Sequence, residues 1–127
     1  MQVQDIMTTN VVSIEASALV SEAIDQMKKK GVHALIVKPK GQEKAYGIIT
    51  EADITYKVIA QANDPKGLTV GDIMTKPCIA VKSDMSVRNV ARLFANNHIH
   101  RTPVINKELV GIISVSDILQ HGQWWTD

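Results

Sequence analysis

Residues Gly47–Asp53 read GIITEAD, and residues Gly111–Asp117 read GIISVSD, 64 positions further along the chain. A second block behaves in the same way, because Val3–Thr8 (VQDIMT) returns as Val70–Thr75 (VGDIMT) at a spacing of 67. Two blocks repeated in the same order indicate an internal duplication. The difference between the two spacings places an insertion in the first copy, and the polar stretch Pro39–Lys44 is the loop expected to hold it.

Around these blocks each copy predicts the same order of elements. A helical turn at Asp5–Thr8 precedes a strand near Val11–Ile14. Apolar residues spaced at i, i+3, i+4 and i+7 then predict an amphipathic helix. The residues are Val20, Ala23, Ile24 and Met27 in the first copy, and Val87, Val90, Ala91 and Phe94 in the second. The run Lys28–Gly31 is typical of a helix C-terminus.

A strand pair and a closing helix complete each copy. The strands are expected at residues 34–37 and 46–49 in the first copy, and at 103–105 and 109–113 in the second. The closing helix starts near Thr50 or Ser114, and residues 63–67 form the linker between the copies. Cys78 is expected on an inner strand as a buried, inert thiol. The predicted fold class is α/β (α+β), with two tandem β-α-β-β-α repeats.

The duplication also predicts the domain organisation. A half of roughly 60 residues is marginal alone, so the two repeats are expected to pack sheet to sheet about a pseudo-two-fold axis, with two clefts between them. Residues 1–127 then form a single domain, with repeat 1 at 1–62, repeat 2 at 68–122 and an aromatic tail at 123–127. Trp124 and Trp125 in the tail are expected to pack on the domain or on a second copy, with a partner contact as the alternative.

The balance of charge excludes several classes of partner. The chain carries a net charge of +1 with a pI near 7.9, so no overall basic field favours nucleic acid or an anionic membrane. No run of about 18 apolar residues occurs, which excludes a membrane-spanning helix. The first residues lack a basic segment followed by an apolar one, and Cys78 is the one cysteine. We therefore expect no signal peptide, no internal disulfide and a cytoplasmic location.

The motif Thr50-x-x-Asp53, repeated as Ser114-x-x-Asp117, supports two interpretations. As Ser/Thr-x-x-acid before an apolar helix it predicts a capping box, in which hydroxyl and carboxylate satisfy the first backbone N–H groups. A carboxylate held there also accepts hydrogen bonds from both hydroxyls of a ribose, while the hydroxyl and exposed N–H groups meet phosphate. The two interpretations are compatible, and Asp53 and Asp117 are the leading candidate ribose ligands.

The segment His98-Ile99-His100-Arg101 supports three hypotheses. If Ile99 faces the core, His98 and His100 share the other face as a strand begins. In the first hypothesis the two histidines are ligands of a metal ion, and in the second they form a polar edge exposed to solvent. In the third, His100 and Arg101 form a local positively charged site that binds phosphate. The spacing implies no carboxylate or cysteine near the histidines, which argues against the metal site.

Taken together, the motifs resemble CBS domains. They are Asp-Ile-Met-Thr at the start of each copy, His-Ile-His-Arg-Thr-Pro-Val before the second hairpin, and Gly-Ile-Ile-(Thr/Ser)-x-x-Asp into the last helix. The resemblance covers about Val3 to His121. It implies a Bateman module, a tandem pair packed by its sheets that often associates as a disc-like dimer. Its clefts would bind AMP, ADP, ATP, S-adenosylmethionine or a related compound and relay occupancy to an attached or partner protein.

The resemblance also implies how site residues are shared between the copies. The cleft built on Asp117 would combine Ser114, Ser116 and Ile112 with His33 and Ala34. The cleft built on Asp53 would combine Thr50 and Ile48 with His100 and Arg101, with the alternative that Arg101 reaches both clefts. In similar proteins the matching His-Arg pair contacts nucleotide phosphate. The first copy has His33-Ala34-Leu35 where the second has His100-Arg101-Thr102, so its arginine is absent and the two clefts are expected to differ.

No constellation for catalysis accompanies these motifs. The sequence has no P-loop, no Gly-x-Ser-x-Gly and no zinc-ligand spacing. We therefore predict a stand-alone, non-enzymatic regulatory module for energy sensing that requires no cofactor and no metal. The module would bind an adenine nucleotide and form a homodimer through its helical faces. It would pass its signal to an effector protein. The rivals are a nucleotide-independent interaction scaffold and a small enzyme or metal protein that uses His98 and His100.

Overall fold

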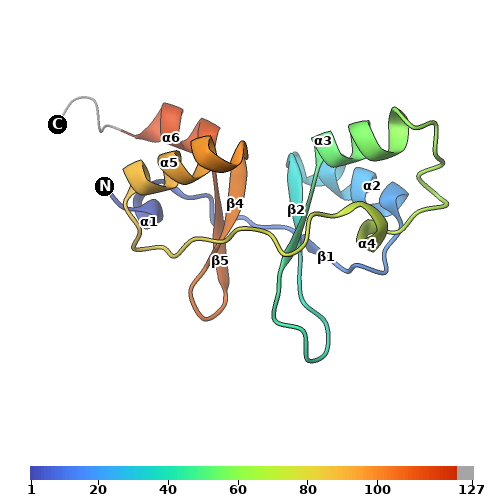
Figure 1. Ribbon diagram of the computed structural model, residues 1–127, viewed down its shortest axis with the longest axis horizontal. Coiled ribbons are helices and arrows are strands. Elements are labelled where there is room, and N and C mark those ends of the chain that lie inside the picture. The colour runs from blue at the N-terminus through green and yellow to red at the C-terminus, as the bar shows by residue number, and fades with distance from the viewer. Residues whose placement is uncertain (123–127) are drawn as a thin grey trace. The chain divides into compact units, whose positions relative to one another are not determined.

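A three-stranded sheet and a two-stranded sheet organise residues 1–122, the part of the chain described in this computed structural model (Figure 1). In the first sheet β1 (Ser13–Ile14) runs parallel to β2 (Ala34–Val37), and β2 pairs antiparallel with β3 (Gly47–Thr50). In the second, β4 (Arg101–Ile105) pairs antiparallel with β5 (Leu109–Ser114). The mixture of helices and sheets confirms the predicted α+β class.

Helices lie between and after the strands in the predicted order. α2 (Val20–Lys30) connects β1 to β2, and α3 (Glu51–Ile54) follows β3 and continues into a π-helix, η1 (Thr55–Ile59). α5 (Val87–Asn97) precedes β4, and α6 (Val115–His121) follows β5. The copies also differ at the first strand: where the first has β1, residues 79–82 of the second make an isolated parallel bridge between Val81 and Val104.

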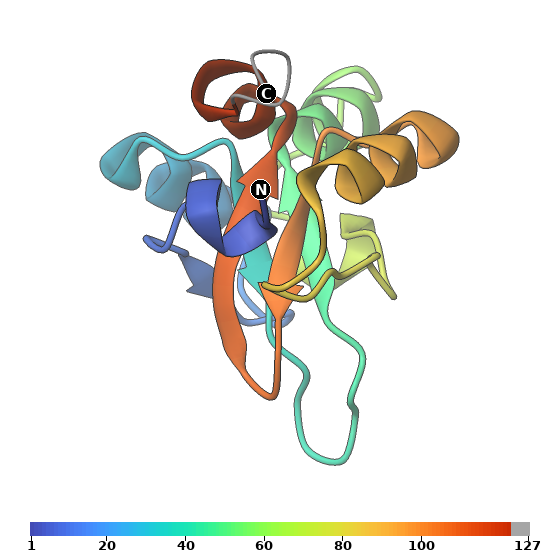
Figure 2. The ribbon, with the colours of Figure 1, turned by 90° about the vertical axis from the view of Figure 1, so that its left-hand side faces the viewer.

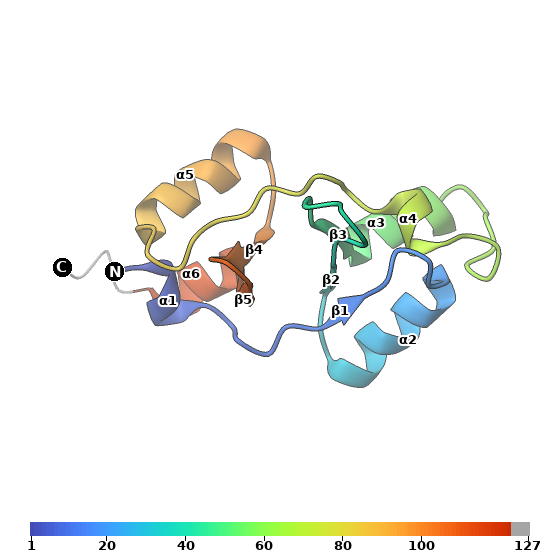
Figure 3. The same cartoon turned by 90° about the horizontal axis from the view of Figure 1, so that it is seen from below.

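Two compact units are present, and they do not coincide with the two sequence copies (Figure 3). The first unit is Val12–Cys78, and the second unit combines Met1–Val11 with the chain from Ile79 onward. α1 (Val3–Ile6), which opens the first copy, therefore lies in the second unit, and α4 (Val70–Ile73), which opens the second copy, lies in the first. Each copy thus contributes the opening turn of the other copy's unit.

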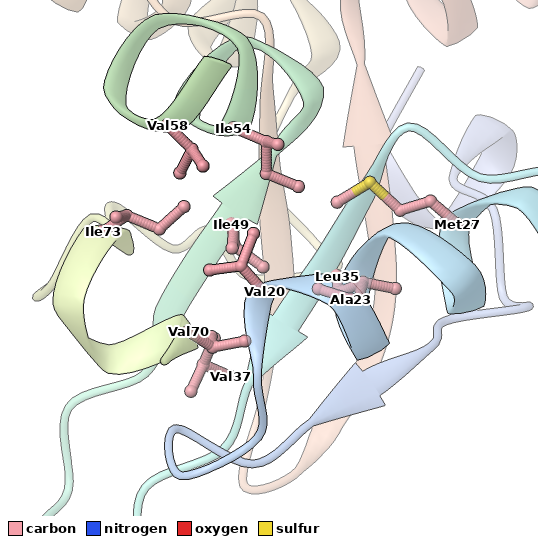
Figure 4. Packing of buried hydrophobic residues seen from close by; sticks show 10 residues of the cluster. All are labelled: Val20, Ala23, Met27, Leu35, Val37, Ile49, Ile54, Val58, Val70 and Ile73. Atoms are coloured by element: carbon pink, nitrogen blue, oxygen red, sulfur yellow. The ribbon is translucent and has the colours of Figure 1, made fainter. Parts of the chain in front are cut away.

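The core of the first unit is built from all of its helices and from β2 and β3 (Figure 4). Its buried side chains include the predicted α2 stripe, and α4 contributes two more: Val20, Ala23, Met27, Leu35, Val37, Ile49, Ile54, Val58, Val70 and Ile73. Since Val70 and Ile73 come from the second copy, the first copy does not complete its own core. Burying a side chain of this size contributes about 1.5–3 kcal/mol relative to leaving it exposed.

The second unit repeats this arrangement with the partners exchanged. Val3 and Ile6 of α1 pack with the apolar stripe of α5 and with β4, β5 and α6, in a buried cluster of Val3, Ile6, Val81, Val87, Val90, Phe94, Val104, Ile113 and Ile118. The buried hydroxyl of Thr102 donates to the backbone oxygen of Ile79, so this polar group is satisfied inside the cluster.

The segment after each opening turn is bonded to the last strand of the unit it joins. Thr8 and Ile112 exchange two backbone hydrogen bonds of 2.9 Å each, and Thr75 and Ile48 exchange two of 2.9 and 3.0 Å. Glycine precedes each isoleucine, at Gly47 and Gly111, where a Cβ atom would collide with the incoming segment. The glycines of the repeated motif are therefore needed for a close backbone approach.

Helix ends and loops follow the sequence pattern closely. α2 ends on Gly31 in the left-handed conformation (φ 63°), as Lys28–Gly31 predicted, and α5 ends on His98 at the matching repeat position (φ 53°). The loop after β2 is longer than the loop after β4 (Figure 2), which agrees with the predicted insertion in the first copy. Within residues 1–122 no helix is long and apolar enough to cross a membrane.

The prediction that Cys78 is buried on an inner strand is wrong. Cys78 lies outside any strand and is only partly buried, and its N–H donates to the Tyr46 backbone oxygen. Desolvation by burial raises the pKa of the thiol above its ordinary value, and the backbone hydrogen bond opposes that rise. At the repeat spacing of 67, Cys78 corresponds to Val11, which also lies outside a strand because β1 begins only at Ser13.

We predict that Gly111→Ala lowers the free energy of unfolding by about 1–3 kcal/mol, measured by urea denaturation, because overpacked sites cost this much. The added Cβ would lie 2.8 Å from Met7 Sδ and 2.9 Å from the Thr8 backbone oxygen. The matched control is Gly67→Ala, whose Cβ would meet nothing closer than 3.5 Å. Equal stability of the Gly111 variant and the control would contradict the close approach described above.

Candidate functional site

The repeated Ser/Thr-x-x-Asp motif forms a complete capping box in each copy. At the end of β3, Thr50 Oγ1 accepts from the Asp53 N–H at 3.1 Å, and Asp53 Oδ2 accepts from the Thr50 N–H at 3.0 Å. At the end of β5, Ser114 Oγ accepts from the Asp117 N–H at 3.2 Å, and Asp117 Oδ2 accepts from the Ser114 N–H at 2.9 Å. The predicted capping interpretation is therefore confirmed for both motifs.

One oxygen of each aspartate carries the capping role alone. Oδ2 of Asp53 also accepts from Thr50 Oγ1 at 3.1 Å, and Oδ2 of Asp117 accepts from Ser114 Oγ at 3.0 Å. Oδ1 takes no part in the cap in either copy. A carboxylate fixed through one oxygen in this way presents the other to a ligand, which is the geometry that the ribose hypothesis requires.

The outward oxygens have different neighbours. Asp53 Oδ1 lies 3.2 Å from Lys57 Nζ, and the Asp53 side chain is 14% exposed. Asp117 Oδ1 accepts from Thr8 Oγ1 at 3.3 Å, and no ion pair of Asp117 is found among residues 1–122. Neither Thr8 nor Lys57 was among the predicted site residues. The signal for Lys57 was its position four residues after Asp53, and the signal for Thr8 was its place in the repeated Asp-Ile-Met-Thr.

In the first unit, His33 and Ala34 lie beside the capping box of their own copy. Ala34 is the register partner of Thr50, and the Glu51 N–H donates to the His33 backbone oxygen at 3.1 Å. His33 Nδ1 is 2.9 Å from Glu51 Oε1, in an exposed pair. Ile48 is buried, and its N–H and C=O are both bonded to Thr75.

The second unit places its counterparts in the same way. Arg101 is the register partner of Ser114, and the Val115 N–H donates to the His100 backbone oxygen at 2.8 Å. Ile112 is bonded to Thr8 through both backbone groups, and Ser116 is exposed on the first turn of α6. The sharing of these residues across the copies, Asp117 with His33 and Ala34 and Asp53 with His100 and Arg101, stays a prediction.

The structure of the segment His98–Arg101 agrees only in part with the prediction that His98 and His100 share one face of a strand. Ile99 packs against the core of the second unit as predicted, but β4 begins only at Arg101, so strand alternation does not yet apply to His98 and His100. Both histidines are exposed. Within residues 1–122 no group of three or more His, Cys, Asp or Glu side chains is arranged to hold a metal ion.

A second candidate surface lies on the helices of each unit. In the second unit a groove of about 540 Å³ runs between α5 and α6, with Phe94 and Ile118 in its lining and Leu119 73% exposed at its edge. In the first unit a groove of about 320 Å³ lies between α2 and the α3–η1 segment, with Ile54 in its lining and Ile59 56% exposed. Paired apolar grooves of this kind are typical of interaction surfaces. Trp124 and Trp125 lie outside the described residues.

Comparison with known proteins gives a consistent result. A family model described as CBS domain matches residues 3–60 and 70–123. The structure of a hexameric CBS-CP12 protein from bloom-forming cyanobacteria is similar over 99% of this chain and 73% of that chain, with 50% identity and a TM-score of 0.96. The CBS domain pair of protein MJ0100, solved in complex with 5′-methylthioadenosine and S-adenosyl-L-methionine, is 27% identical over 94% of each chain, with a TM-score of 0.82.

Curated relatives extend the comparison to longer proteins. The mitochondrial CBS domain-containing protein CBSX3 of Arabidopsis thaliana is 37% identical over 80% of this chain. An uncharacterised protein of Methanopyrus kandleri is 34% identical over 75% of this chain. The chain spans about half the length of these two relatives, 51% and 49%.

We predict that Ser114→Ala lowers the free energy of unfolding by about 1 kcal/mol in urea denaturation, because it removes the side-chain partner of an orphan N–H at the start of α6. Ser116→Ala, two residues later and exposed, is the matched control and is expected to change little. A cost as small for Ser114 as for Ser116 would show that the cap contributes nothing to stability.

Proposed function

The chain belongs to the CBS-domain family as a tandem pair, and from this we propose a regulatory module that binds an adenosine-containing ligand and reports its occupancy to another protein. The ligand class is AMP, ADP, ATP or a related adenosine compound such as S-adenosylmethionine. The module acts without catalysis and without a required cofactor. A related CBS pair solved with two adenosine compounds supports the ligand class.

The observation that carries the proposal is the division of each aspartate between two tasks. Oδ2 is used by the cap, while Oδ1 is directed to a neighbouring donor that a ligand hydroxyl is able to replace. A ribose offers two adjacent hydroxyl donors, which suit an ionised carboxylate better than a neutral acceptor. His100 and Arg101, which the family resemblance assigns to the cleft built on Asp53, are the proposed phosphate contacts.

Signalling would follow from differential affinity. A ligand shifts a conformational equilibrium only by as much as it binds one state more tightly than the other. The proposed output is a change in the population of module conformations that an effector protein recognises. In a cell the adenosine ligand would then serve as a measure of energy state, in a soluble, cytoplasmic setting.

We also propose a homodimer formed through the helical faces. The same apolar groove occurs on both units of a duplicated chain, and Tyr56 and Val115 add exposed apolar area beside Ile59 and Leu119. A two-fold interface brings the same patch together from both subunits, so a surface that is apolar in both units suits a second copy of this chain. The hexameric state stated for a similar CBS-CP12 protein supports association within this family.

Isothermal calorimetry and thermal shift with AMP, ADP, ATP and S-adenosylmethionine test the ligand. We expect binding by the wild-type chain and a loss of about ten- to a hundredfold in affinity at each site for the double variant Asp53→Asn with Asp117→Asn, because each site loses a charge-assisted hydrogen bond. Asp84→Asn, at an exposed carboxylate away from both caps, is the matched control. Undiminished binding by the double variant would disprove the ribose assignment. The absence of binding at millimolar ligand would favour the interaction scaffold.

Sedimentation at several protein concentrations tests the dimer. Leu119→Glu is expected to shift the wild-type dimer toward monomer, since it places a charge in the apolar surface between α5 and α6. Gln120→Glu adds the same charge at the next, exposed position of α6 and serves as the control. A monomeric wild-type chain, or a dimer that tolerates Leu119→Glu, would argue against this interface.

A further inference from the structure

The carboxylates of Asp53 and Asp117 have the same kind of hydrogen-bond partners at Oδ2 and different partners at Oδ1. Both use Oδ2 for the cap, with N–H and hydroxyl donors at 2.9–3.1 Å. At Oδ1, Asp53 faces the Lys57 ammonium group at 3.2 Å, whereas Asp117 faces the Thr8 hydroxyl at 3.3 Å. One partner is a cation and the other is neutral. The difference lies at the oxygen that a ribose would use.

Lys57 is held at this position by a hydrogen bond in addition to its ion pair with Asp53. Its Nζ donates to the backbone oxygen of Ile73 at 2.8 Å, at the end of α4. The ammonium group thus bridges the Asp53 carboxylate and the helical turn that the second copy contributes to the first unit. Lys57 also lies within the π-helix η1, whereas His121, at the same repeat position, is the last residue of the α-helix α6. The duplicated elements therefore differ in backbone as well as in side chain.

The repeat identifies the residue that replaces Lys57 in the second copy. At the spacing of 64 positions that relates Asp53 to Asp117, Lys57 corresponds to His121. His121 is the last residue of α6, and within residues 1–122 no ion pair joins it to Asp117. A hydroxyl such as that of Thr8 rotates and both donates and accepts, so it accommodates a ribose diol at the same oxygen.

We propose that Lys57, by pairing with Oδ1 of Asp53, prevents a ribose from binding to that carboxylate. In the wild-type chain Asp117 alone then binds the ribose of an adenosine ligand. This inference rests on the proposed function and makes it specific: the module has one working site for each chain, chosen by the residue four positions after the aspartate. Lys57 is a positioning residue, because it acts through Asp53 and its bond to Ile73 rather than on the ligand.

The arginine pattern of the sequence favours the opposite ranking. In the cross-copy hypothesis Arg101 belongs to the cleft of Asp53, and the cleft of Asp117 receives the arginine-free His33 segment. A phosphate-dominated site would then use Asp53, whereas a ribose-dominated site uses Asp117. The recognition of both hydroxyls requires Oδ1, and in the first unit this oxygen already faces a cation that also donates to the Ile73 backbone oxygen, whereas in the second unit it faces a neutral hydroxyl. We therefore rank the Asp117 site first.

A reciprocal exchange of the two residues tests the proposal by calorimetric titration with AMP and, separately, with S-adenosyl-L-methionine. Lys57→His should raise the stoichiometry from one to two ligands for each chain, and Asp53→Asn in that background should abolish the second site. His121→Lys should weaken the wild-type site by about tenfold or more, the loss expected when a charged hydrogen-bonding group is no longer available. Lys30→His, at the exposed end of α2, is the control. Because an exchanged ion pair of this exposure contributes little to stability, the variants are expected to fold.

The outcomes separate this inference from the proposed function. If Lys57→His leaves the stoichiometry unchanged, or if binding by the wild-type chain survives Asp117→Asn, Lys57 does not select the site, although the module still binds a nucleotide. If His121→Lys binds as tightly as the wild-type chain, the same conclusion holds. If none of AMP, ADP, ATP and S-adenosyl-L-methionine binds to any variant, the proposed function and the inference both fail.

Discussion

The exchange of opening turns between the two copies is the constraint on which the rest of this molecule depends. α1 and α4 each bury two apolar residues in the unit of the opposite copy, and the residues that follow them bond to the last strand of that unit. Neither repeat completes a core from its own residues. A contact that joins distant parts of the chain carries a loop-closure cost, which the burial of four aliphatic side chains offsets.

The same exchange determines what surrounds each aspartate. The turn after α1 brings the Thr8 hydroxyl to Asp117, and the end of α4 brings the Ile73 backbone oxygen to Lys57. The close approach also explains why the repeated motif begins with glycine, since a Cβ at Gly47 or Gly111 would strike the methionine of the incoming segment. One packing event thus fixes both the stability of a unit and the environment of its candidate site. A duplicated backbone is then able to evolve two unlike sites by changing a single side chain near each carboxylate.

The sequence predicted most of the elements because their signals are local. Short apolar runs, the i, i+3, i+4, i+7 stripe and the Ser/Thr-x-x-Asp box each depend on residues within a few positions of one another, and β2, α2, α5 and both caps were found where expected. The exchange of α1 and α4 was not predictable, because the apolar pattern of Val3–Ile6 shows that a face is buried and not which copy buries it. The strand predicted at Cys78 failed because the apolar run Val11–Ile14 suggested a longer strand than β1, which begins at Ser13. Cys78 corresponds to Val11 in the repeat and therefore lies before the strand position. Lys57 was visible at i+4 from Asp53, but its bond to Ile73 joins residues 16 positions apart and has no sequence signal.

Capping and ligand binding need not compete for the same carboxylate. An ionised aspartate has two oxygens, each able to accept more than one hydrogen bond, and the cap uses the lone pairs of Oδ2. Because the cap already fixes the side-chain rotamer, a ligand that bonds to Oδ1 does not bear the entropy cost of ordering the aspartate. A residue that an analysis of helix stability would class as structural is therefore well suited to recognition for the same physical reason. Under this proposal, the neighbour of Oδ1 determines whether the aspartate only caps its helix or also binds a ligand. The two copies have different neighbours at this oxygen, a lysine and a threonine.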